Sequence, residues 1–224
     1  MKKFLLVLCV LLAACSPAFS ASYRMDEDGQ VYRNGKIIRN AELYPVDGTV
    51  LKWMNDNNAV YIFNPANPEK APVRVSLRKG EKCTDVYTGY SDSFVLSLQS
   101  NYLLIVGANG KTIERVPGFG PIFWVDEYRF VFTSCIPNRK RPGGQLWLGA
   151  AVFEYFVDGA GITETLTTPI AEPTETENYV VSGFDGVTCL VVIDEVSSPE
   201  EWSDPDRNPN ETLREVHMEL PAAG

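Results

Sequence analysis

Two stretches decide the fold class of this 224-residue chain: GPIFWVDEYRFVFTSC at residues 120–135 and LWLGAAVFEYFVDGAGITETLTT at residues 146–168. Both are rich in β-branched and aromatic residues, which favour strands. The second contains Asp158-Gly159, a dipeptide that supplies the backbone angles of a tight hairpin turn. Together the stretches predict a strand, a turn, a second strand, a loop, a third strand, a hairpin turn and a fourth strand.

The same pattern continues outward from this centre in both directions. Asn-Gly and Asp-Gly pairs recur between short apolar runs, as expected where antiparallel strands are joined by hairpins. The other runs are TVLKWM (49–54), AVYIF (59–63), VRVSL (73–77), FVLSLQ (94–99), YLLIV (102–106) and CLVVI (189–193). The sequence therefore predicts an all-β fold, built as an antiparallel hairpin meander.

Residues 120–168 resemble one blade of a β-propeller, in which four antiparallel strands follow one another. The resemblance implies a propeller-like fold with about four blades of about 45 residues each. The alternative is a non-repeating β-sandwich or a barrel of short strands. The polar, Pro-containing segments 167–177 and 197–212 are predicted surface loops, and residues 213–220 alternate as a strand.

The N-terminal residues carry an export signal. Lys2 and Lys3 precede an apolar run that ends at Ala14 and is too short to cross a bilayer, so residues 1–14 are a predicted signal peptide. Leu12-Ala13-Ala14-Cys15 resembles the lipobox of bacterial lipoproteins. The resemblance implies that Cys15 becomes a lipidated N-terminus bearing acyl chains such as palmitate.

The lipobox also sets the expected domains and location. We expect a lipidated tether at 15–25, a single all-β domain at 26–220 and a tail at 221–224. Ser16 follows the lipidated residue, which resembles the sorting signal for the outer membrane on the periplasmic side. The alternative is cleavage after Ser20, which would give a soluble periplasmic or secreted protein.

Charge is unevenly distributed along the chain. The net charge is −9, which argues against general nucleic-acid binding. Residues 1–150 hold 18 basic and 13 acidic side chains, whereas residues 151–224 hold 2 basic and 16 acidic ones. Such polarity can steer a basic protein partner or a cation to one side of the molecule; the alternative is that the charges only face water and keep the protein soluble. The candidate contacts are the basic loop formed by Arg139, Lys140 and Arg141, and Trp202, which is either packed inward or exposed.

Few residues point to a cofactor or to catalysis. Asp204, Asp206, Asn208 and Glu215 have the spacing of an EF-hand calcium loop, although Pro209 replaces the glycine that the loop requires. No other cofactor is expected. His217 is the only histidine, and no catalytic residue is predicted. Once the signal is removed, Cys83, Cys135 and Cys189 remain, as buried apolar residues or with one disulfide between two of them.

These features predict a non-enzymatic, acidic envelope lipoprotein that acts by binding a protein. It would serve either as an assembly or scaffold factor or as a periplasmic immunity protein against a toxin. The alternatives are a hydrolase that uses carboxylates from separate strands, and a module that binds calcium or a small ligand.

Overall fold

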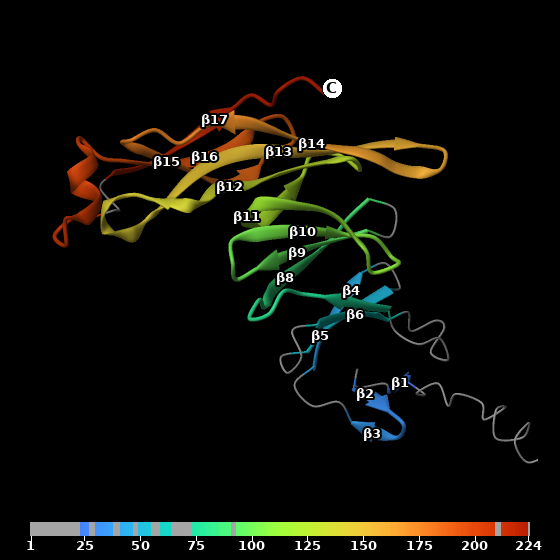
Figure 1. Ribbon diagram of the computed structural model, residues 1–224. Helices are drawn as coiled ribbons and strands as arrows, with labels where there is room; N and C mark the ends of the chain where they lie inside the picture. Colours follow the sequence, from blue (N-terminus) through green and yellow to red (C-terminus); the bar gives the residue numbers. More distant parts are fainter. Residues whose placement is uncertain are drawn as a thin grey trace, which may run out of the picture.

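The computed structural model describes residues 23–26, 30–37, 41–46, 49–54, 59–63, 73–90, 93–208 and 212–223 (Figure 1). Their regular structure is strand apart from two short 3-10 turns, η1 (Pro142–Gly144) and η2 (Pro199–Ser203), so the all-β prediction is confirmed. Within these residues no helix has the length and apolar character needed to cross a membrane. The signal segment 1–14, Cys15 and Ser20 lie outside the described residues.

Every apolar run expected to form a strand does so. The strands are β5 (Thr49–Met54), β6 (Ala59–Phe63), β7 (Val73–Ser76), β9 (Phe94–Leu98), β10 (Tyr102–Val106), β12 (Arg129–Lys140), β13 (Leu146–Asp158) and β16 (Cys189–Glu195). Asn34-Gly35 forms the turn between two short strands, with both residues at positive φ. The turn dipeptides therefore act as predicted in this part of the chain.

The described strands form four sheets in which each strand pairs antiparallel with its neighbour in the chain. The first two sheets are β1 (Tyr23–Met25), β2 (Val31–Arg33) and β3 (Lys36–Ile37), then β4 (Ala41–Val46) to β7. A seven-stranded sheet follows, with β8 (Cys83–Thr88), β9, β10, β11 (Thr112–Trp124), β12, β13 and β14 (Gly161–Ala171). The last sheet holds β15 (Glu177–Phe184), β16 and β17 (Leu213–Met218). The meander is confirmed.

Strand β11 divides the seven-stranded sheet into two layers. Residues 112–117 pair with β10, whereas Gly118 to Trp124 pair with β12. At the change of partner Gly118 has φ 156°, and a Cβ there would lie 2.5 Å from the Thr133 carbonyl oxygen. Strands that pass between packed layers in this way form the corners of β-sandwiches. We call β8–β10 with residues 112–117 the β8 layer, and residues 118–124 with β12–β14 the β14 layer.

Three apolar cores lie between successive layers. The first joins β6 and β7 to the β8 layer, and includes Val60, Val75 and Leu96. The second joins the two layers of the seven-stranded sheet around the stacked rings of Phe130 and Phe153. The third joins the other face of β12 and β13 to the β15–β17 sheet. In Figure 1 the layers follow one another in chain order, from β4–β6 to β15–β17.

The strands within residues 120–168 follow one another in the order expected of a propeller blade, but the described sheets do not close into a propeller. The four strands expected within residues 120–168 are the C-terminal half of β11, then β12, β13 and β14. The sheets contain unequal numbers of strands, and the described layers stack in a row instead of closing around an axis (Figure 1). This arrangement matches the sandwich alternative. The predicted loop at 167–177 is partly wrong, because β14 continues to Ala171 by pairing with β13.

Candidate functional site

The predicted basic loop is only partly exposed. Arg139 and Lys140 are exposed at the end of β12, but Arg141 is buried at 3% exposure. Its guanidinium donates hydrogen bonds to three main-chain carbonyls, those of Thr174, Glu175 and Glu177. Burial, together with the neighbouring Arg139, lowers the pKa of Arg141. As a correction to the sequence analysis, Arg141 fastens the turn between β14 and β15 and is not available to a partner.

Trp202 is packed inward, as the first of its two interpretations predicted. It is 3% exposed, and its indole N–H donates to the Glu175 carbonyl at 2.8 Å. The Arg141 guanidinium lies between the rings of Trp202 and Trp147, 4.4 and 4.2 Å from their centres. Arg139 covers the Trp147 ring at 3.8 Å, so its exposed charge is held in place by the stack.

The candidate calcium residues are distributed over two elements. Asp204 and Asp206 follow η2, and Asp204 accepts the Asp206 N–H at 2.9 Å. Glu215 lies on β17 and accepts a hydrogen bond from Ser182 at 3.1 Å. Asn208 is exposed, and residues 209–211 lie outside the described residues. No group of three or more potential His, Cys, Asp or Glu ligands occurs among the residues described, so calcium binding stays a prediction.

His217 lies on β17 as an exposed strand residue. Its Nδ1 is 3.1 Å from the Asp185 carboxylate and 3.0 Å from the Thr188 hydroxyl. A serine-protease-like relay uses both ring nitrogens, one for the acid and one for the hydroxyl. Both contacts here fall on Nδ1, so this cluster stabilises the β15–β16 turn and is not arranged as a relay.

The three described cysteines are buried. Cys83 belongs to the first core and Cys189 to the third. Burial raises the pKa of Cys135 to about 11 and that of Cys189 to about 12. They therefore act as small apolar residues with suppressed thiolate chemistry.

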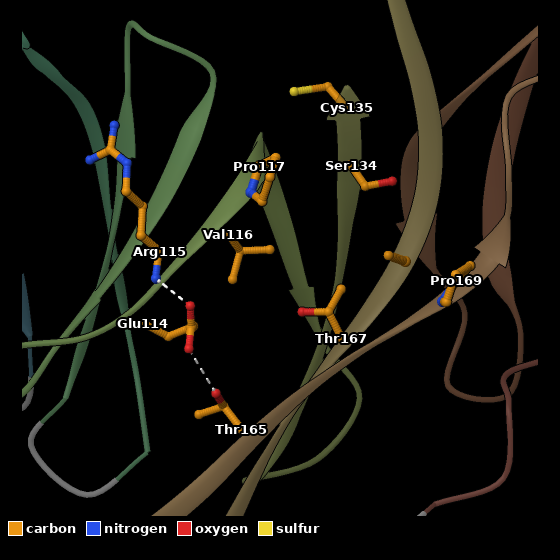
Figure 2. Close-up of a pocket in the computed structure, with 10 residues that line it drawn as sticks. Glu114, Arg115, Val116, Pro117, Ser134, Cys135, Thr165, Thr167 and Pro169 are labelled. Carbon is orange, nitrogen blue, oxygen red and sulfur yellow. Dashed lines mark hydrogen bonds between the residues drawn. The ribbon is translucent and has the colours of Figure 1, made fainter. Parts of the chain in front are cut away.

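A groove runs between β11 and β14, at the corner of the seven-stranded sheet. Two hollows, of about 400 and 290 Å³, lie between these strands. A third hollow of about 310 Å³ is lined by β12, β13, the end of β14 and the two residues after it, and it shares wall residues with the 400 Å³ hollow. The central hollow shares Glu114 and Thr165 with one neighbour, and Ser134, Cys135 and Pro169 with the other. Figure 2 shows the central hollow, with residues 114–117 on one side and Thr165, Thr167 and Pro169 on the other.

Glu114 spans the groove with its carboxylate. One oxygen accepts the main-chain N–H of Arg115 at 3.0 Å, and the other accepts the Thr165 hydroxyl at 3.4 Å (Figure 2). The Arg115 side chain points away from β14, because it pairs with Glu81 and stacks on Tyr102. The polar side of this groove is therefore set by Glu114 and the threonines.

The Arg115 N–H marks an open strand edge. Gly118 N–H donates to the Asn101 carbonyl, and hydrogen bonding alternates along an antiparallel strand, so Arg115 directs its main-chain groups away from β10. Strand β14, across the groove, is an edge strand of the same sheet. Open edges can take an added strand, and inward-pointing charges such as Glu114 protect them.

This groove was not predictable from the sequence pattern. Its walls come from strands about fifty residues apart, and they meet only because β11 changes partners at Gly118. The only local signals were the Pro117-Gly118 break and the alternating threonines of β14. No protein-family model matches the chain, and a search of curated proteins finds no significant match.

Proposed function

We propose that this protein is a non-enzymatic lipoprotein of a bacterial envelope that acts by binding another protein. The observation that carries the proposal is the groove, in which an open edge of β11 faces edge strand β14. Such an arrangement suits an extended segment of a partner, which would gain main-chain hydrogen bonds at the edge. The lipobox at Cys15 supports the location on the periplasmic side of the outer membrane.

The groove is better suited to binding than to hydrolysis. Glu114 and Glu164 are the acids from separate strands that line it, and both are exposed. The Glu114 carboxylate is already engaged by a main-chain N–H and a hydroxyl. A general acid in a glycosidase-like pair instead lies in an apolar environment that raises its pKa.

Site-specific photo-crosslinking tests the binding proposal. A photoreactive residue replaces Thr167, in the groove wall, in the full chain expressed in its native envelope. The matched control replaces Ser203, which is exposed on η2 and lines none of the three hollows. We expect one defined adduct from position 167 alone, and the purified crosslinked protein should bind the purified full chain. Absence of a 167-specific adduct contradicts the proposal.

The nature of the captured protein separates the two forms of the proposal. A basic toxin would support an immunity protein, whereas an envelope assembly component would support a scaffold factor. The anchor is tested separately by Cys15→Ala, which should release the protein from the membrane fraction. Unchanged membrane fractionation would contradict the lipoprotein assignment without affecting the groove.

A further inference from the structure

Acidic side chains line one end of the groove, and an arginine lines the other end. At one end the hollow between β11 and β14 is lined by Ile113, Ile162 and two threonines, with Glu114 and Glu164 as its only charged side chains. At the other end the wall includes Arg139, fixed over the Trp147 ring. Glu172 also lines this second end, and it is exposed. The two acids therefore line the hollow on one side of the central hollow, and the stacked arginine lines the hollow on its other side.

The middle of the groove is partly apolar. Its wall combines Val116, Pro117, Cys135, Ala151, Thr167 and Pro169. Between Glu164 and Ala171 strand β14 extends over about 25 Å at the rise of a β-strand, which is the length of about seven residues of extended chain. The alternation of side chains along an added strand would place every second one against this apolar wall.

We propose that the groove takes an extended peptide segment of a partner protein, about seven residues long, with Lys or Arg at the Glu114/Glu164 end and a carboxylate at the Arg139 end. This inference rests on the proposed function and deepens it by naming the chemistry of the partner. The inference rests on charge complementarity at both ends of the groove. A bound strand without charges would give the acidic and basic side chains there no ion-pair partner.

In this arrangement Glu114 blocks the open edge of β11 until a basic side chain binds. In the empty groove its carboxylate occupies the Arg115 N–H. A basic side chain of the guest pairs with that carboxylate and draws it away. The Arg115 N–H then donates to a main-chain carbonyl of the bound segment. The edge of β11 therefore pairs only with a segment that contains a basic side chain.

Fluorescence anisotropy with end-blocked, labelled peptides tests the polarity. The probes are Glu-Thr-Val-Thr-Val-Thr-Lys and the same residues in reverse order, because the edge can accept either chain direction. Two further pairs replace Lys or Glu by Gln. Each is titrated with the full chain purified in detergent, as wild type and as Glu164→Gln and Arg139→Gln. Glu219→Gln and Lys79→Gln serve as exposed controls that line none of the three hollows.

We expect one chain direction to bind, with each charge worth about twofold to fivefold in affinity. Glu164→Gln should weaken only peptides that contain Lys, and Arg139→Gln only those that contain Glu; the controls should change nothing. Glu114→Ala should weaken the Lys peptide but bind the Gln-for-Lys peptide at least as well as wild type, because the Arg115 N–H is released.

The other outcomes overturn the inference in distinguishable ways. If the substitutions changed the affinity for charged and neutral peptides equally, the groove would bind peptides without recognising their charges. No peptide binding, with a 167-specific crosslink still present, would reject this partner chemistry but not the proposed function. Self-association of the chain that the same substitutions abolish, measured by light scattering, would place a second copy in the groove.

Discussion

Replacing Arg141 by Met tests how the last sheet is fastened to the rest of the molecule. The change removes three hydrogen bonds from a charged donor to the carbonyls of residues 174–177, as well as the stack between Trp147 and Trp202. Each such bond contributes about 1.5–3 kcal/mol, and each cation–π contact about 0.5–2 kcal/mol. Removing a buried cation also recovers its desolvation cost, which offsets part of the loss. We expect a net loss of about 3–5 kcal/mol.

Urea unfolding followed by tryptophan fluorescence measures this loss directly, because two of the four tryptophans flank the substituted side chain. For a domain of this size the loss corresponds to a fall of roughly 10 °C in Tm. Arg139→Met is the matched control, since Arg139 is exposed and only covers the Trp147 ring; it should cost about 1 kcal/mol or less. An Arg141→Met protein within 1 kcal/mol of wild type would refute the fastening role.

Three further substitutions probe single contacts. Thr133→Val removes the hydroxyl that accepts the buried Val181 N–H at 3.0 Å, and should cost about 1–3 kcal/mol in urea unfolding, whereas Thr133→Ser should recover most of the loss. Gly118→Ala should lower Tm by several degrees, since its Cβ would lie 2.5 Å from the Thr133 carbonyl; Gly159→Ala, with nothing within 4 Å, should be neutral, and equal effects would contradict the close approach. The N–H groups of Thr188 and Val187 hold the pKa of Asp185 well below its usual value, so its stabilising effect is present above about pH 4 and is lost as pH falls further. The Tm difference between wild type and Asp185→Asn should therefore shrink from pH 6 to pH 3, and a constant difference would count against this linkage.

The strands were predictable because their signals are local. Short β-branched runs such as 102–106 and turn pairs such as Asn34-Gly35 specify hairpins without help from distant residues. The polar composition from residue 167 onward predicts a loop there, although the pairing of β14 with β13 continues to Ala171. The ring closure suggested by the blade resemblance depends on angles between layers, which a repeat pattern does not encode.

The site was less predictable because it depends on long-range pairing. Arg141 looked like one of three surface cations, and its carbonyl partners lie more than thirty residues further along the chain. The groove depends on the change of partner within β11, which places Glu114 opposite Thr165. The inward packing of Trp202 was among the stated interpretations, since a large aromatic ring in a polar loop is usually buried.

The order of the layers has a consequence for how the chain acquires its structure. Each described core joins layers that are consecutive along the chain, so the layers from the β8 layer onward can each find a packing partner in the segment that has just preceded them. Nearest-neighbour architectures of this kind behave as one-dimensional arrays. During synthesis from the N-terminus the chain can therefore condense layer by layer, and the Arg141 hydrogen bonds form once residues 174–177 have been made.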